Sequence, residues 1–328
     1  MQTPPIIEYL AQQAEDQGYL DYAQFVQVAL YHPDHGYYTA KRQRVGKTKS
    51  ADFYTSTTIG PLFGQLVIEA ACTLLPSEDP EAYTFVEIAA EPGKSTLAGL
   101  PSPFGHSKVI RLGEPINVKG KAIVFANEWL DAQPFHRLIF TGGNWREIAI
   151  QIESGKLSET LLDQPSPETL PWLKELPCPH HEGYHLDIPT GAQNVLITLL
   201  SQTWEGLFLT LDYGKRLEAL IHETPQGTAR AYKNHHQSKE LLAHPGKQDL
   251  TCHLCWEWLE DAMEKAGFEE IRLLRQESLF MRHSQETIRQ TLENQQSPEV
   301  VGKIKELLHP AHLGHTFHAL YGYRTKKH

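Results

Sequence analysis

The stretch YTFVEIAAEPGKSTL at residues 83–97 decides the fold that this sequence predicts. Residues 83–89 form a short apolar run, typical of a buried parallel strand, and a turn that ends in Gly93 follows directly. The turn runs into Lys94-Ser95-Thr96, where a helix can open. Two similar apolar runs lie at 121–126 and 207–211, so we expect the parallel sheet of an α/β fold.

Each of the three runs ends at or near an acidic residue. Glu87 lies at the end of the first run, Glu128 follows the second and Asp212 follows the third. In open α/β sheets, ligands bind beyond the carboxyl ends of the strands. These carboxylates are therefore candidates to bind a hydroxylated or cationic ligand.

Apolar spacing and turn residues predict the remaining elements. Helices are expected at 6–17, 22–30, 192–203, 256–266 and 298–308, and short strands at 108–112, 271–274, 279–281 and 316–323. Residues 32–63 are expected to form a long ordered loop, and its basic middle at 41–49 is either solvated or in contact with a ligand. The Gly142-Gly143 pair and several prolines interrupt the α/β pattern at 137–190, which we expect to be an insertion over the site.

Composition excludes several classes of protein. The 328 residues are 40% hydrophobic and 21% charged, as in ordinary globular domains, and no apolar run is long enough for a membrane span. A net charge of −10 disfavours nucleic-acid binding. Only four cysteines and no secretory signal pattern predict a protein of the cytoplasm.

The segment NEWLDAQP at 127–134 places Asn127, Glu128 and Asp131 directly after the second apolar run. Buried carboxylates need partners. A guanidinium or ammonium group of a ligand would supply one, and so would an arginine in a purely structural network. The residues alone leave both interpretations open.

Cys252 and Cys255 have the Cys-x-x-Cys spacing of zinc and redox sites. Because no second pair has ligand spacing, we interpret them as small buried side chains near a helix start and predict no metal site. The sequence contains no Gly-x-Ser-x-Gly, P-loop or His-Glu-x-x-His motif, so it gives no support to the usual hydrolase, nucleotide triphosphatase and metalloprotease classes.

An ordered series of motifs along almost the whole chain resembles the mitochondrial-dysfunction-protein-A family of S-adenosylmethionine-dependent methyltransferases. The motifs are YHP at 31–33, GYY at 36–38, DFYTS at 52–56, FG at 63–64, NEWLDAQP at 127–134, DYG at 212–214, RAY at 230–232 and DLTCH at 249–253. The human mitochondrial member of that family is an arginine methyltransferase in complex I assembly, so the resemblance implies methyl transfer to a protein side chain, most simply arginine.

The resemblance also implies a role for individual residues. The S-adenosyl-L-methionine site would contain Asp52, Thr55, Ser56, Phe63, Gly64, Glu87, Gly93 and Glu114. The catalytic group would be Asn127, Glu128 and Asp131. Within these sets, Glu114 would bind the ribose, Glu128 and Asp131 would hold the acceptor, and Asn127 and Glu87 would shape the cofactor side.

The sequence departs from the family at the turn itself. The family has Glu-x-Gly-x-Gly-x-Gly-Thr-Leu, whereas residues 87–97 read EIAAEPGKSTL, so Ala89 and Glu91 replace two glycines. The interval from Glu87 to Asn127 is also shorter than the family's. A non-catalytic descendant that has lost the cofactor and kept a role in assembly or interaction is therefore the competing hypothesis, and a different small ligand is a third.

The predicted architecture is a Rossmann-like sheet of the class I methyltransferase type. We expect residues 1–65 to form an N-terminal helical cap and loop, and 66–328 to form the Rossmann-like domain with the insertion at about 137–190. A protein substrate is the expected partner, without nucleic acid or membrane insertion.

Overall fold

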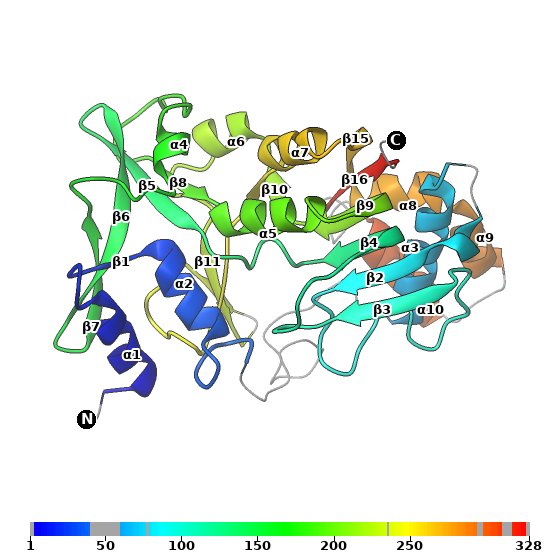
Figure 1. The fold of residues 1–328 in the computed structure, drawn as a ribbon, viewed down its shortest axis with the longest axis horizontal. Coiled ribbons are helices and arrows are strands. Elements are labelled where there is room, and N and C mark those ends of the chain that lie inside the picture. The colour runs from blue at the N-terminus through cyan, green and yellow to red at the C-terminus, as the bar shows by residue number, and fades with distance from the viewer. Residues whose placement is uncertain are drawn as a thin grey trace. The chain divides into compact units, whose positions relative to one another are not determined.

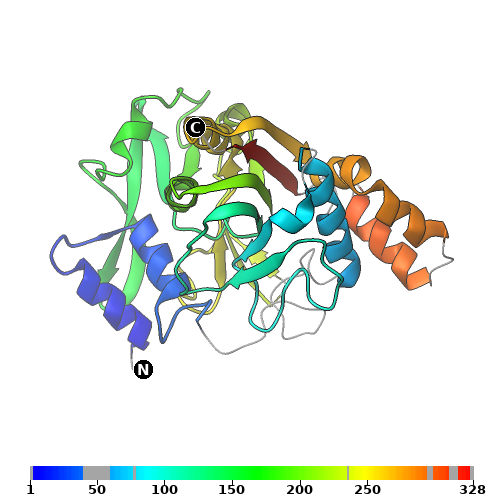
Figure 2. The same ribbon diagram turned by 45° about the vertical axis from the view of Figure 1, so that its right-hand side comes forward.

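The computed structural model describes residues 3–39, 60–76, 79–234, 236–293, 298–309 and 317–325. These residues form two units, each assembled from three separate stretches (Figures 1 and 2). The antiparallel unit comprises the described residues within Met1–Phe53, Leu130–Asn194 and Lys215–Glu257. The mixed-sheet unit comprises those within Tyr54–Trp129, Val195–Gly214 and Trp258–His328.

Six strands build the sheet of the mixed-sheet unit. They are β2 (Thr84–Ile88), β3 (His106–Ile110), β4 (Gly120–Asn127), β9 (Trp204–Asp212), β15 (Glu269–Arg275) and β16 (His318–Arg324). Their order is β15-β16-β9-β4-β2-β3, in which β3, β2, β4 and β9 run parallel and β16 is antiparallel to both of its neighbours. The predicted adjacent parallel strands are confirmed, and the carboxyl ends of β2, β4 and β9 lie at one edge.

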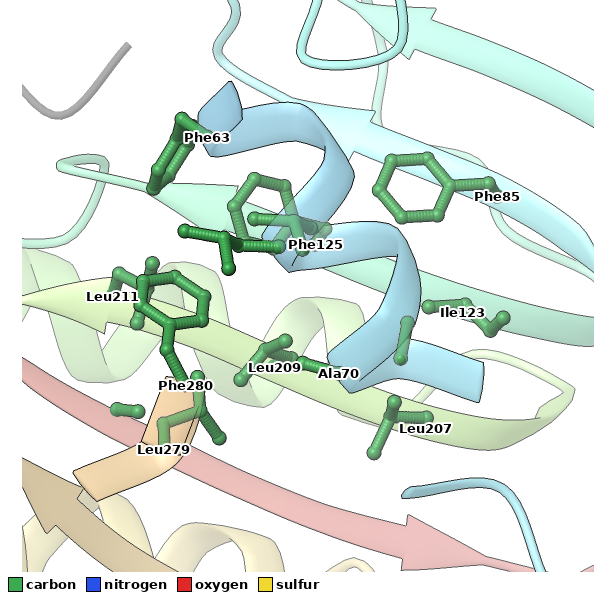
Figure 3. Close-up of a cluster of buried hydrophobic side chains, with 14 of the residues drawn as sticks. Phe63, Ala70, Phe85, Ile123, Phe125, Leu207, Leu209, Leu211, Leu279 and Phe280 are labelled. Carbon is green, nitrogen blue, oxygen red and sulfur yellow. The ribbon is translucent and has the colours of Figure 1, made fainter. Parts of the chain in front are cut away.

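Four helices cover one face of this sheet (Figure 2). They are α3 (Pro61–Leu74), α8 (Gln276–His283), α9 (Gln285–Glu293) and α10 (Pro298–Leu308). Alternate residues of the central strands point into the core beneath them, including Phe85 of β2, Phe125 of β4 and Leu209 of β9 (Figure 3). Strands β4 and β9 are buried along most of their length, which explains why they appear as continuous apolar runs in the sequence.

The strand expected at 279–281 is wrong, because these residues lie inside α8. Leu279 and Phe280 are buried and Met281 is 53% exposed, so the run does not continue on one buried surface. Gln276, Leu279 and Phe280 instead form one buried helical face at the spacing i, i+3, i+4. Three adjacent apolar residues are too few to distinguish the two periodicities.

The links between the first strands of this sheet are short. Residues 89–105 join β2 to β3 through turns only, so no helix opens after Lys94-Ser95-Thr96. Residues 111–119 then return the chain past β2 to β4. Parallel neighbours are usually joined by a helix, and its absence here leaves the shape of the 89–105 link to side-chain contacts.

The antiparallel unit holds two smaller sheets, besides the two-stranded pairing of β14 with β10 (Gly214–Lys215). One has the order β1-β6-β5-β8, with β7 also paired to β6, and the other has the order β12-β11-β13. Its strands are β1 (Leu20–Asp21), β5 (His136–Thr141), β6 (Asn144–Glu153), β7 (Lys156–Leu161), β8 (His185–Ile188), β11 (Arg230–Lys233), β12 (His236–Ser238), β13 (Asp249–Thr251) and β14 (Leu254–Cys255). Gly142 and Gly143, with φ of 61° and 76°, form the two-residue hairpin turn between β5 and β6.

Helices complete this unit and link it along the chain to the other. They are α1 (Pro5–Ala14), α2 (Tyr22–Tyr31), α4 (Leu170–Leu173) and α6 (Leu217–His222). Asp21 begins α2 through a capping box with Gln24. Three further elements have residues in both units: α5 (Thr190–Leu200), β10 (Gly214–Lys215) and α7 (Trp256–Lys265).

The division of the chain differs from the expected boundary at residues 65–66. Helix α3 runs continuously through that point. Strand β1 of the expected cap pairs with β6 of the expected insertion, with Leu20 opposite Ile150. The N-terminal helices and the insertion therefore share one core, which pairing between distant segments creates and local patterns do not reveal.

Interacting ionisable side chains are buried in the antiparallel unit, and Arg137 with Asp187 forms the first group. Arg137 donates from Nε to Asp187 at 2.9 Å, and the Asp187 carboxylate also accepts the backbone N–H groups of Thr228 and Ala229. Burial alone would lower the pKa of Arg137, but Asp187, Tyr22 and Glu159 together outweigh burial and raise that pKa. These partners make the pair part of the packing of the unit.

His136 and Glu147 form the second group, at 2.8 Å. Burial alone would raise the pKa of Glu147, but hydrogen bonds from His136, from the Ser166 backbone and from Thr169 hold that pKa below its ordinary value. In the described part of the chain, no helix is long and apolar enough to cross a membrane.

Candidate functional site

The candidate site lies at the carboxyl edge of the mixed sheet, where three neighbouring strands end. Glu87 is the penultimate residue of β2, Asn127 is the last residue of β4 and Asp212 is the last residue of β9. In the strand register Glu87 is beside Phe125, and Asn127 is beside Leu211. The parallel topology thus gathers the polar strand ends that the sequence singled out.

The Glu87 carboxylate is fully engaged by the chain that follows it. Only 5% of the residue is exposed. Its oxygens accept hydrogen bonds from Ser95 Oγ at 2.8 Å, from Thr96 Oγ1 at 2.6 Å and from the Thr96 backbone N–H at 2.9 Å. Glu87 therefore fixes the far end of the turn.

Helix α3 packs directly against this part of the turn. A Cβ added to Gly64 would lie 2.1 Å from the Thr96 carbonyl oxygen, so only glycine permits the approach. Phe63 is 1% exposed and its ring packs against Phe125 and Phe280 (Figure 3). Both residues thus shape the site through packing.

The turn at 89–94 keeps a glycine-like backbone in spite of its sequence. Ala89 has φ of 61° and Gly93 has φ of 74°. A Cβ at Gly93 would meet nothing within 4 Å, so the backbone is open on that side. Ala89 adopts the left-handed conformation that costs a non-glycine residue about 1–2 kcal/mol. Such residues persist where the surrounding structure imposes them and are enriched at functional sites.

The end of β4 holds a buried acceptor without a donor. Asn127 Nδ2 donates to Glu128 Oε1 at 2.9 Å, which orients the amide. Asn127 Oδ1 is buried and has no hydrogen-bond partner among the described residues. Glu128 itself has φ of 52°, and its backbone N–H donates to the Leu211 carbonyl at 2.9 Å. An unpaired buried acceptor costs about 1–3 kcal/mol, which a ligand N–H or O–H would recover.

Asp131 belongs to the antiparallel unit, unlike Asn127 and Glu128. It is 6% exposed, and its backbone carbonyl accepts the N–H of Cys252. Burial, and then the carboxylates of Asp249 and Asp131, raise the pKa of Tyr31. Tyr38 stacks on Tyr31 at 5.5 Å between ring centroids, so Asp131 faces a buried aromatic and acidic environment.

Residues 82–273, which are more than half of the chain, match the family described as "Putative S-adenosyl-L-methionine-dependent methyltransferase". The chain belongs to this methyltransferase family. It is 25% identical over 316 residues to the human protein named "Protein arginine methyltransferase NDUFAF7, mitochondrial", covering 78% of this chain and 68% of that protein. The zebrafish (Danio rerio) protein of the same name is 28% identical over 171 residues, covering 50% of this chain but only 36% of the relative's length.

Two solved structures share the fold of this chain over almost its whole length. A crystal structure from Burkholderia thailandensis, bound to S-adenosyl-homocysteine, superposes with a TM-score of 0.84 over 99% of this chain and 95% of that chain, at 20% identity. A second structure from that organism gives a TM-score of 0.79 at 18% identity. The Rossmann-like class I methyltransferase fold predicted from the sequence is confirmed.

The residues at this edge of the sheet fit the cofactor of the family. S-adenosyl-L-methionine carries an ammonium group and ribose hydroxyls, which are hydrogen-bond donors. Asn127 Oδ1 is a buried acceptor that has no donor of its own among the described residues. The turn from Ala89 to Gly93 retains the open backbone conformation despite its changed residues. The exposed Glu114 follows β3, and its Oε2 accepts the Arg111 N–H at 2.9 Å.

The structure brings together part of the predicted site. The turn is surrounded or supported by Glu87, Gly93, Gly64 and Phe63. Asn127 ends the neighbouring strand β4, and Glu128 follows it. Asp52, Thr55 and Ser56, which the resemblance assigns to the cofactor site, lie outside the described residues. Cys252 and Cys255 are buried and do not form a disulfide.

Sequence reasoning missed three residues that build the turn: Ser95, Thr96 and Arg111. The hydroxyl pair close after an acidic strand end was one available signal, and an arginine directly after the next strand was another. Neither signal predicts a contact with the turn, because Ser95, Thr96 and Arg111 meet around it in a link that has no helix after β2.

Proposed function

We propose that this chain transfers a methyl group from S-adenosyl-L-methionine to a nitrogen of a protein side chain, with arginine as the acceptor. The observation that carries the proposal is the buried Asn127 Oδ1, which has no donor among the described residues and belongs to an amide that Glu128 orients where β2 and β4 end. The likeness to relatives named as protein arginine methyltransferases supports the choice of acceptor.

When bound, the cofactor supplies a methyl group on a sulfonium, which is already an activated leaving group. The protein then needs chiefly to hold the acceptor nitrogen in line and to exclude water. In the proposal, Asn127 accepts a hydrogen bond from the cofactor side, and the Glu128 carboxylate orients the guanidinium and takes up the proton released as the new C–N bond forms.

Titration calorimetry with S-adenosyl-homocysteine tests the cofactor part of the proposal. The unmodified protein should bind with micromolar affinity, about −8 kcal/mol. Asn127→Leu should weaken binding at least about tenfold, because it removes a hydrogen bond to a charged donor. The same change should alter the free energy of unfolding by less than about 1 kcal/mol, since it also removes an unsatisfied buried oxygen.

Asn117→Leu is the matched control, because Asn117 is an exposed asparagine of the same unit. It should bind S-adenosyl-homocysteine as the unmodified protein does. Absence of binding to the unmodified protein at millimolar concentration would contradict the proposal and favour the non-catalytic descendant. The observation that favours this non-catalytic hypothesis is the absence of a helix in the link at 89–105.

Peptides that differ at one position test the acceptor. With labelled S-adenosyl-L-methionine, a peptide containing arginine should gain label, whereas the same peptide with lysine or glutamine at that position should not. Equal labelling of the lysine peptide would overturn the arginine assignment while leaving methyl transfer intact.

The low cysteine content supports the further proposal that the protein works in the cytoplasm.

A further inference from the structure

The link after β2 is the part of the site where this chain departs most from its family. Its residues 89–105 form turns without a helix, and two of the family's glycines are Ala89 and Glu91. A helix would hold such a turn through its own backbone hydrogen bonds. Here two side chains of opposite charge contact the turn from its two ends.

Arg111 supplies the positive charge. It lies directly after β3, the edge strand beside β2, and the Ala89 N–H donates to the Ile110 carbonyl at 2.8 Å. Arg111 Nη1 lies 3.4, 3.1 and 3.2 Å from the carbonyl oxygens of Ala90, Glu91 and Lys94. One guanidinium nitrogen therefore gathers three carbonyl groups of the turn.

Glu87 supplies the negative charge at the other end. Its carboxylate accepts the Thr96 backbone N–H and the hydroxyls of Ser95 and Thr96. The Glu87 carboxylate thus accepts hydrogen bonds from N–H and O–H groups of the link, and the Arg111 guanidinium donates to its carbonyl groups. Charge-assisted hydrogen bonds are about twice as strong as neutral ones, so the pair can replace the order that a helix would provide.

We infer that Arg111 is a positioning residue for the cofactor: together with Glu87 it holds the 89–96 turn in the shape that the missing glycines and helix would otherwise impose. This inference rests on the proposed function, since it assigns the turn to cofactor binding. Arg111 itself need not touch the ligand. All three carbonyl contacts come from Arg111 Nη1, so replacing Arg111 removes them together.

The test combines Arg111→Met, Arg111→Lys and the control Lys108→Met. Lys108 lies on the same strand and also donates to a backbone carbonyl, that of Asn117, at 2.9 Å. Amide hydrogen exchange of residues 88–97 in the ligand-free proteins should become about tenfold faster in Arg111→Met and stay unchanged in Lys108→Met. Affinity for S-adenosyl-homocysteine should fall about tenfold in Arg111→Met, with partial recovery in Arg111→Lys.

The outcomes separate this inference from the proposed function. Unchanged exchange and unchanged affinity in Arg111→Met would overturn the positioning role while leaving the methyltransferase proposal intact. Faster exchange with unchanged affinity would make Arg111 a structural residue only. If the unmodified protein binds no S-adenosyl-homocysteine, both proposals fail, and the exchange data then report only how the turn is held.

Discussion

Replacing Ala89 by glycine should stabilise the protein, although alanine-to-glycine changes usually destabilise. Ala89 is exposed and has φ of 61°, so its Cβ contributes strain and no core packing. Relief of left-handed strain is worth about 1–2 kcal/mol. The greater backbone entropy of glycine in the unfolded chain offsets about 0.5–1 kcal/mol of this gain. We expect a net increase of about 0.5–1 kcal/mol in the free energy of unfolding.

The adjacent Ala90 is a matched control, because its φ is not positive. Ala90→Gly should lower the free energy of unfolding by about 0.5–1 kcal/mol, so the two neighbouring substitutions should have opposite signs. Urea unfolding of the mixed-sheet unit is monitored by hydrogen exchange of the β2 and β4 amides. Equal destabilisation by both substitutions would refute the assignment of a left-handed conformation to Ala89.

Ala89→Gly also tests whether the absence of the family's glycine at this position impairs function. Because Ala89 already adopts the glycine-like conformation, Ala89→Gly should change the affinity for S-adenosyl-homocysteine by less than about threefold. A large gain in affinity would show that alanine disables the turn, as the non-catalytic hypothesis requires.

Three further predictions concern packing and buried charge. Glu147 has a lowered pKa in the folded protein, so it stabilises the fold above its ordinary pKa of 4.5, and this stabilisation is lost as the pH falls through the folded pKa. Glu147→Gln should therefore flatten the acid limb of a curve of unfolding free energy against pH. An unchanged acid limb would exclude this role for the hydrogen bond between Glu147 and His136. Gly64→Ala should cost about 1–3 kcal/mol in urea unfolding, because the added Cβ would lie 2.1 Å from the Thr96 carbonyl oxygen; a neutral result would show that α3 can move. Asp187→Ala should cost about 3–5 kcal/mol by leaving its arginine partner buried and uncompensated, and a loss below 1 kcal/mol would contradict that burial.

The sequence by itself determined the central sheet and the polar residues at its edge. The apolar runs at 83–89, 121–126 and 207–211 are continuous because most of β2, β4 and β9 is buried, so the residue types in the sequence reveal these strands directly. Parallel strands place their carboxyl ends together, so the grouping of Glu87 with Asn127 followed from the strand assignment alone.

Only the tertiary structure decided how the chain is divided and how the turn is held. Pairing of β1 with β6 joins residues far apart in sequence, and local periodicity carries no information about such partners. The three contacts from Arg111 to the turn likewise depend on the neighbouring position of β3. The conformation of Ala89 had no sequence signal, because alanine normally avoids positive φ and adopts it here only under the constraint of its surroundings.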